Sequence, residues 1–491
     1  MKRFGYVGLA LLITSVGFAQ GTLGPPVENH AAAGVDVLLA DTWLFPIDID
    51  NGSYWEPDTE IFGVDGTIAI IAGTWPDGVY SSAMTAKVAF IDMEGNVNER
   101  WAWIADNGTP YSAWTINDSR TDGNPPVITV DTRKNGTKRF MVGQESTPWM
   151  YDEFTSAPNR WAGTFAYDKQ TACVQIQNLN ADGTTSKVTN VFDPIYMAGG
   201  IAGAQAGSQI RFGGEVRSLS NGNFLVIPED RAKGVVTDGN GAVAGIFTQD
   251  GANVKVAFNA KIEGGASDIW SNVASFNGGW VARLQGKMNV WNNDGTPRYV
   301  LDQTTFSSIT DAGRGDGLRI KGNVAHTTVY FGGVNPDGYV SMSRVDLGQS
   351  SEGTAVGAKE FLINNDEFWD VSVMDRADVA VDEYNNSIIV WDEKFSSENP
   401  QVVGVIFDSD LNPVTPVFYA FQQHDWWGGG GFSGFTNYEV NTSMDNHRIV
   451  VAANGVFANP AGGMTPKEQT FCIVYKNPQE QEVPVREWTV Y

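Results

Sequence analysis

Residues 378–393 read DVAVDEYNNSIIVWDE, and residues 402–418 read VVGVIFDSDLNPVTPVF. Each stretch has an apolar strand, a turn built from Asn and Asp, and a second apolar strand. The two stretches therefore predict two β-hairpins in series. Similar two-hairpin units recur about seven times along the chain, and four strands per repeated unit is typical of a β-propeller.

The remaining units can be followed in order along the 491 residues. First hairpins are expected at residues 61–72, 127–142, 216–227, 273–284, 318–331, 379–391 and 438–452. Second hairpins are expected at residues 88–103, 173–192, 243–258, 288–301, 340–363, 402–418 and 471–490. We therefore predict an all-β fold, a single β-propeller of seven four-stranded blades over residues 35–491. Six or eight blades, and a pair of β-sandwich domains, stay open as alternatives.

The unit at 378–418 resembles the repeats of exported bacterial β-propeller-repeat proteins. In that family pattern an acidic–Gly turn precedes a VVVW strand, and an F-D-x-x-G turn follows. This chain carries Asn386 and Asn412 where Gly is usual. The resemblance implies an exported propeller. It brings no catalytic residue with it, because such repeats occur in proteins of varied function.

The N-terminus has the pattern of a secretory signal peptide at residues 1–19. Lys2 and Arg3 precede an apolar run at 7–16, and small residues precede a cleavage site at Gln20. Residues 20–34 are rich in Gly, Pro and Ala and predict a flexible leader. No second apolar run is long enough to span a bilayer. We expect the mature protein to be secreted, periplasmic or on the cell surface.

The charge is strongly acidic, with 57 Asp and Glu against 32 Lys and Arg, a formal net charge of −25. Such a surface repels phosphate backbones, so we expect no nucleic-acid partner. Solubility explains most of the charge, and Ca²⁺ binding by clustered carboxylates is the sharper interpretation. Acids at the starts of inner strands are expected near one rim, where they could hold Ca²⁺ or a sugar hydroxyl: Asp311, Asp316, Asp375, Asp378 and Asp382. Solvated turn residues are the alternative.

The most unusual segment is the connection that holds His424, Asp425, Trp426 and Trp427, followed by four glycines. Two adjacent Trp with a His and an acid on a flexible loop could bind a sugar ring, with His424 as an acid or base. The alternative is that the aromatic side chains cover a blade edge. No His-x-x-x-His pair or Gly-x-Ser-x-Gly sequence is present. Catalytic residues are therefore left unassigned.

These observations favour a binding or surface-interaction module, with a polysaccharide or a surface protein as its partner. A carbohydrate-active enzyme, hydrolase or lyase, with a site at one end of the channel is the second hypothesis. A structural component of the cell envelope is the third. Ca²⁺ is the one cofactor that the composition suggests.

Two expectations test the order of the repeats. Cys173 and Cys472 fall in the third strands of units two and seven, which unit one separates. They are therefore expected to be too far apart for a disulfide, which needs Cα atoms within about 7 Å. Trp391 ends a wholly apolar strand and is expected in the core between blades.

Overall fold

The computed structural model describes the strands of the chain and part of their connections. The described residues are 17–20, 23, 27, 31–48, 58–62, 67–74, 83–91, 94–101, 114–115, 126–132, 138–144, 165–167, 172–179, 185–186, 190–192, 214–221, 223–228, 242–247, 253–260, 273–284, 287–302, 318–334, 340–363, 377–393, 401–420, 440–457 and 467–481. All regular secondary structure among them is β. None of these residues belongs to a helix that could cross a membrane.

The described strands form seven sheets. The first strand named in each sheet is the innermost, and the others follow outward. Sheet 1 contains β3 (Asp58–Phe62), β4 (Thr67–Thr74), β5 (Ala83–Ile91) and β6 (Val97–Trp101), with β7 (Trp114–Thr115) paired to β5. Sheet 2 contains β8 (Pro126–Thr132), β9 (Lys138–Gln144), β11 (Ala172–Leu179) and β10 (Phe165–Tyr167), with β12 (Thr185–Ser186) and β13 (Asn190–Phe192) paired to β11. Sheet 3 contains β14 (Gly214–Ser218), β15 (Phe224–Pro228), β16 (Ala242–Phe247) and β17 (Asn253–Ala260).

The other four sheets follow the same antiparallel order. Sheet 4 contains β18 (Val273–Phe276), β19 (Gly279–Leu284), β20 (Lys287–Asn292) and β21 (Pro297–Asp302). Sheet 5 contains β22 (Leu318–Gly322), β23 (Thr328–Val334), β24 (Val340–Ser351) and β25 (Thr354–Leu362), with β1 (Gly17–Gln20) parallel to β25. Sheet 6 contains β26 (Ala377–Val381), β27 (Ser387–Glu393), β28 (Gln401–Phe407) and β29 (Phe418–Tyr419). Sheet 7 contains β30 (Val440–Met444), β31 (Arg448–Phe457), β32 (Lys467–Lys476) and β2 (Val37–Asp48).

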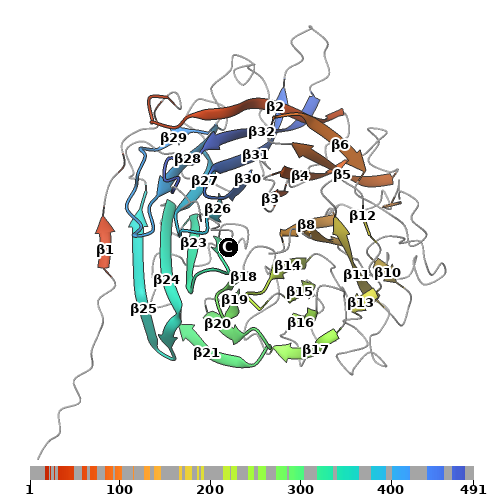
Figure 1. The fold of residues 1–491 in the computed structure, drawn as a ribbon, viewed down its shortest axis with the longest axis vertical. Helices are drawn as coiled ribbons and strands as arrows, with labels where there is room; N and C mark the ends of the chain where they lie inside the picture. The colour runs from red at the N-terminus through yellow and green to blue at the C-terminus, as the bar shows by residue number, and fades with distance from the viewer. Residues whose placement is uncertain are drawn as a thin grey trace, which may run out of the picture.

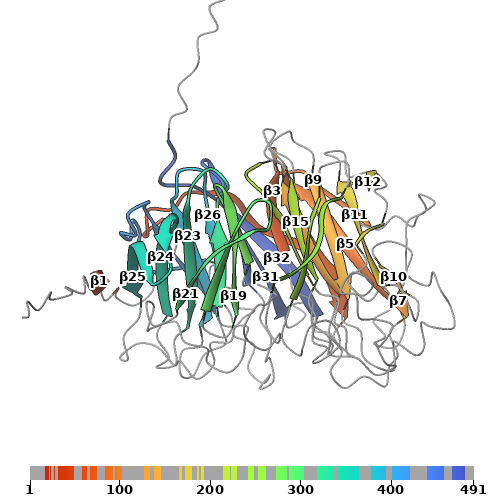
Figure 2. The same ribbon diagram turned by 90° about the horizontal axis from the view of Figure 1, so that it is seen from below.

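The innermost strands contact one another in cyclic order: β3, β8, β14, β18, β22, β26, β30 and again β3. Figure 1 shows the sheets around a common centre, and Figure 2 shows them side by side with their strands running between the two ends. Four-stranded sheets in this arrangement are consistent with propeller blades. All seven predicted first hairpins are confirmed as antiparallel pairs.

The last sheet corrects one prediction. We expected a hairpin at 471–490 to supply the third and fourth strands of the last unit. Instead β32 lies between β31 and β2, so the fourth strand comes from the N-terminal part of the chain. Pairing the first long strand with the last described one joins the two ends of the chain within one sheet. A repeat count taken from the C-terminal sequence alone cannot reveal this exchange.

Described residues of the predicted leader also contact the sheets. The Val27 N–H donates to the Val417 carbonyl at 2.9 Å, beside β29. Ala33 and Val35 are buried in the apolar cluster between sheets 6 and 7. Strands β25, β29 and β32 of three successive sheets thus each pair with part of residues 17–48. The signal-peptide boundary stays a prediction.

The core lies between neighbouring sheets, because both faces of the strands are apolar. Trp391 is 0% exposed and packs with Phe361 and Phe407 between sheets 5 and 6, which confirms its predicted place. Cys472 is buried in the third strand of sheet 7, and Cys173 lies in the third strand of sheet 2. Both cysteines therefore occupy the predicted strands, with sheet 1 between their sheets.

Two turns of sheet 6 show why Asn replaces Gly in this unit. In the turn at 382–386 the positive φ of 68° falls on Asn385, and in the turn at 408–412 the positive φ of 60° falls on Leu411. Asn386 and Asn412 instead use their side chains, which donate to the carboxylate four residues earlier at 2.7 and 2.9 Å. Asn386 and Asn412 therefore stabilise their turns by side-chain hydrogen bonds. The positive φ in each turn falls on the residue just before them.

The outer strand of sheet 6 is shorter than the sequence predicts. We expected a strand at 414–418, but β29 covers only Phe418–Tyr419. Pro413 and Pro416 have no N–H to donate to a ladder, and the Ile406 N–H bonds to Thr415 Oγ1 at 3.1 Å instead of to a carbonyl. Proline at an edge strand limits further pairing there.

Candidate functional site

The predicted ligand loop lies outside the described residues, which stop at Ala420 and resume at Val440. His424, Asp425, Trp426 and Trp427 all fall in this interval. The interval connects β29, the outermost strand of sheet 6, with β30, the innermost strand of sheet 7. Asp311 and Asp316, before β22, and Asp375, before β26, also lie outside the described residues. Their roles stay predictions.

Asp378 is one of two predicted rim acids, with Asp382, that the structure describes. It is the second residue of β26, where the sequence placed it, and it is buried. Its Oδ2 accepts the Thr442 N–H of β30 at 2.8 Å, and Lys321 Nζ of β22 lies 4.0 Å from Oδ1. Asp378 therefore links the innermost strands of three successive sheets. A carboxylate with these partners acts first as a structural bridge.

The sheets have two different ends. In an antiparallel sheet, the turns between strands one and two and between strands three and four lie at the same end. That end, called here the turn end, holds short turns such as 277–278, 382–386 and 408–412. The connections between strands two and three, and from one sheet to the next, begin and end at the opposite, connection end. The segment 421–439 is one of them.

First-hairpin turns at the turn end are bonded from sheet to sheet. Ser220 Oγ of sheet 3 accepts the Gly278 N–H of sheet 4 at 2.8 Å. The Asn277 N–H donates to the His326 carbonyl of sheet 5 at 2.6 Å, and His326 Nε2 contacts the Glu383 carbonyl of sheet 6. Glu383 Oε2 then accepts the Asn446 N–H of sheet 7 at 3.0 Å. Five consecutive turns thus form one hydrogen-bonded belt.

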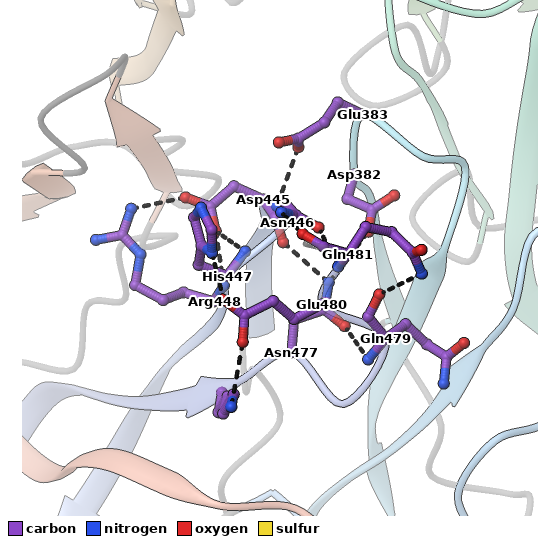
Figure 3. A network of polar contacts seen from close by, with 11 residues as sticks. Asp382, Glu383, Asp445, Asn446, His447, Arg448, Asn477, Gln479, Glu480 and Gln481 are labelled. Atoms are coloured by element: carbon purple, nitrogen blue, oxygen red, sulfur yellow. Dashed lines mark hydrogen bonds and ion pairs between the residues drawn. The ribbon is translucent and has the colours of Figure 1, made fainter. Parts of the chain in front are cut away.

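The belt is densest between sheets 6 and 7, where Figure 3 shows the side chains. Asp382 Oδ2 accepts Asn477 Nδ2 at 3.1 Å, which ties the first turn of sheet 6 to the end of β32. Asn446 and Gln481 bond reciprocally at 2.9 and 2.8 Å. His447 Nδ1 lies 2.6 Å from Glu480 Oε1 on the exposed side. The network holds the two sheets together at this end.

Burial and hydrogen bonding shift the pKa values of three carboxyl groups in this cluster. Burial raises the pKa of Asp382, although hydrogen bonds from Asn386, Tyr384 and Asn477 partly offset the rise. Burial also raises the pKa of Glu383, and the nearby Asp445 and Asp382 carboxylates add to it. Hydrogen bonds from His447 and Lys476 lower the pKa of Glu480, which is exposed.

The two Asp side chains of this cluster serve the turns that carry them. The carboxylates of Asp382 and Asp445 are occupied by backbone N–H groups and by Asn or Arg side chains of the same turns. Among the described residues, no three His, Cys, Asp or Glu side chains group as metal ligands. We expected Asp382 beside Asp378 at one rim. It lies instead in the turn that follows β26, at the opposite end of that strand, so this expectation is wrong.

Sequence reasoning missed one polar group inside the protein. Glu360 of β25 is 1% exposed, and burial raises its pKa to about 7. Ser341 and Ser343 of β24 are buried on the same face. The available signal was polar residues at alternate positions of otherwise apolar strands, which breaks the pattern of a strand between two blades.

Comparisons with known proteins found no matching family model and no matching curated protein. Among solved structures, a protein of unknown function from Dyadobacter fermentans is 9% identical over 88% of this chain and 99% of its own, with a TM-score of 0.37. AofleA from Arthrobotrys oligospora is 10% identical over 88% of this chain and 86% of its own, with a TM-score of 0.38. The α-L-arabinofuranosidase from Podospora anserina, in complex with cellotriose, is 11% identical over 73% and 94%, with a TM-score of 0.29.

Proposed function

We propose that the chain is an exported, closed seven-bladed β-propeller that binds carbohydrate at its connection end. His424, Asp425, Trp426 and Trp427 form the binding segment in this proposal. The observation that carries it is the difference between the two ends of the sheets. At one end, hydrogen bonds link the short first turns of sheets 3 to 7. The longer connecting segments start and finish at the other end.

Closure of the propeller is supported by two features of the described strands. The innermost strands contact each other cyclically, with β30 against β3. The N-terminal β2 completes the sheet of the C-terminal β32 over a long antiparallel register. A strand shared between the first and last parts of the chain would resist opening of the ring between blades 7 and 1. Seven sheets then correspond to seven blades.

The location of the binding segment is supported by its length and composition. The connections at the turn end are short, such as 277–278 and 352–353. The connection from sheet 6 to sheet 7 is longer and covers residues 421–439. Two adjacent Trp provide flat apolar surfaces that match the apolar faces of sugar rings. His424 and Asp425 supply a donor and an acceptor for hydroxyl groups. Ligand sites typically combine such apolar surface with a few polar groups.

A glycan array tests this proposal, together with a Trp426→Ala/Trp427→Ala double variant. The wild type is expected to bind a defined set of glycans, and the double variant to lose that binding with a nearly unchanged Tm. The matched control is Tyr384→Ala, which removes an aromatic ring that is 37% exposed at the turn end. This control is expected to bind like the wild type.

The outcomes separate the hypotheses. Loss of binding in both variants, or unfolding of the double variant alone, would contradict a binding site on this segment. A polysaccharide-degradation assay on the same glycans distinguishes a binding module from an enzyme, because an enzyme releases shorter sugars from a bound substrate. Mass measurement of the exported protein tests cleavage before Gln20.

A further inference from the structure

A buried polar group lies between sheets 4 and 5, at a place we call the seam. Most of the seam is apolar, with Met288 and Leu301 on one side and Phe331, Val345 and Leu347 on the other. Three polar side chains on the sheet 5 side interrupt it: Ser341 and Ser343 on β24, and Glu360 on β25.

The strand register places these three side chains together. Ser343 is directly opposite Glu360 on one side and Phe331 on the other. Ser341 is two residues earlier on the same strand, so its side chain is on the same face. That face is the seam, because Val345 follows in the same alternation and packs there. Ser341 is opposite Gly333 on one side, which contributes no side chain, and opposite Leu362 on the other.

None of the three side chains has its polar atoms satisfied. Glu360 is 1% exposed, and Ser341 and Ser343 are 0% exposed. In the described part of the chain, both Glu360 oxygens and both Ser hydroxyls are without a hydrogen bond of ordinary geometry. Burial raises the pKa of Glu360 to about 7, and a hydrogen-bonding interaction with the nearby Ser343 hydroxyl offsets only part of the rise. A buried, unpaired carboxylate is costly and requires either a proton or a counter-charge.

We propose that the seam binds one alkali cation, Na⁺ or K⁺, between the Glu360 carboxylate and the hydroxyls of Ser341 and Ser343. The ligand set offers hard oxygen atoms and a single negative charge. A monovalent cation neutralises that charge completely. A divalent cation would leave a net positive charge buried in the seam. The site is separate from the proposed carbohydrate segment.

Cation-dependent stability of the full chain tests this site. Thermal unfolding is followed by circular dichroism at pH 8.5, where Glu360 is ionised, in equal concentrations of NaCl, KCl or choline chloride. A ligand that binds only the folded state raises the Tm as its concentration rises. We expect a saturating rise of about 2 °C or more in NaCl or KCl over choline chloride.

Two variants and one control localise the effect. Glu360→Gln removes the charge with little change in shape and is expected to abolish the difference between the salts. Asp410→Asn removes one carboxylate charge at a 69% exposed position of the neighbouring sheet and is expected to keep the difference. Ser343→Ala is expected to raise the midpoint of the cation titration several-fold, and it provides the test if Glu360→Gln does not fold. Equal Tm values of the wild type in all three salts would overturn the proposal, as would an equal cation shift in Glu360→Gln or an unchanged midpoint in Ser343→Ala.

Discussion

Asp382 and Asp408 offer a matched test of the turn end, because both begin a five-residue turn of sheet 6. In each turn, Oδ1 accepts the N–H groups two and four residues later, and Oδ2 accepts the Asn Nδ2 four residues later. The two turns differ in their surroundings. Asp382 is buried and also accepts Asn477 Nδ2 from sheet 7. Asp408 is only partly buried, and Ser409, Asp410 and Asn412 of its turn are exposed.

The expected losses follow from this difference. In Asp408→Ala, water can replace the carboxylate, so the free energy of unfolding should fall by about 1 kcal/mol. In Asp382→Ala, the buried Asn386 donors and one Asn477 hydrogen lose their acceptor, at about 1–3 kcal/mol for each unsatisfied group. Release of the desolvated carboxylate offsets part of this cost. We therefore expect a net loss of about 3–5 kcal/mol.

Urea unfolding followed by tryptophan fluorescence and by circular dichroism measures both variants under the same conditions. Equal losses of unfolding free energy in the two variants would refute the reasoning. Burial and the hydrogen bond to sheet 7 would then contribute nothing beyond the local turn. A loss in Asp382→Ala that disappears in the Asn477→Ala background would show that the cross-sheet bond supplies most of the effect.

Three further predictions concern the packing between sheets. Trp391→Ala should lower the free energy of unfolding by about 3–5 kcal/mol, measured by urea unfolding, since the side chain is fully buried. Gly332→Ala should cost about 1–3 kcal/mol in the same assay, because a Cβ there would lie 2.3 Å from Val379 Cγ2 of the next sheet. Glu360 binds a proton more tightly in the folded state, with a pKa raised from 4.5 to about 7. In choline chloride the wild type should therefore lose about 3 kcal/mol relative to Glu360→Gln as the pH rises from 4.5 to 7, and no more above that.

The sheets could be predicted from the sequence because their information is local. An apolar strand, a turn with Asp, Asn or Gly, and another apolar strand define each first hairpin, and all seven first hairpins were located in this way. The pairing of β2 with β32 could not be predicted, because it joins residues from opposite ends of the chain. Local patterns carry no information about which distant strand fills an open edge.

The site residues were harder to predict for a different physical reason. Sequence spacing placed Asp378 correctly at the start of an inner strand, but it could not show that the Thr442 N–H and Lys321 occupy its carboxylate. The same spacing put Asp382 at that rim, although a five-residue strand carries the chain to the other end. No sequence motif marks Glu360, because its surroundings are formed by Ser343 on the neighbouring strand and by residues of sheet 4.

The turns also change the interpretation of the acidic composition. Asp294, Asp382, Asp408 and Asp445 each accept backbone N–H groups of residues that follow closely in their own turns. Asp346 does the same at an irregularity within β24. An ionised carboxylate is a stronger acceptor for this purpose than a neutral side chain, and Asp also favours turns. Part of the net charge of −25 is therefore explained by the geometry of repeated hairpins. Carboxylates used in this way are poor candidates for Ca²⁺ ligands, because binding a cation would compete with the hydrogen bonds that hold the turn. A calcium requirement, if measured, should therefore map to acids outside these turns, and Asp311 and Asp316 are the first to test by Asn substitution.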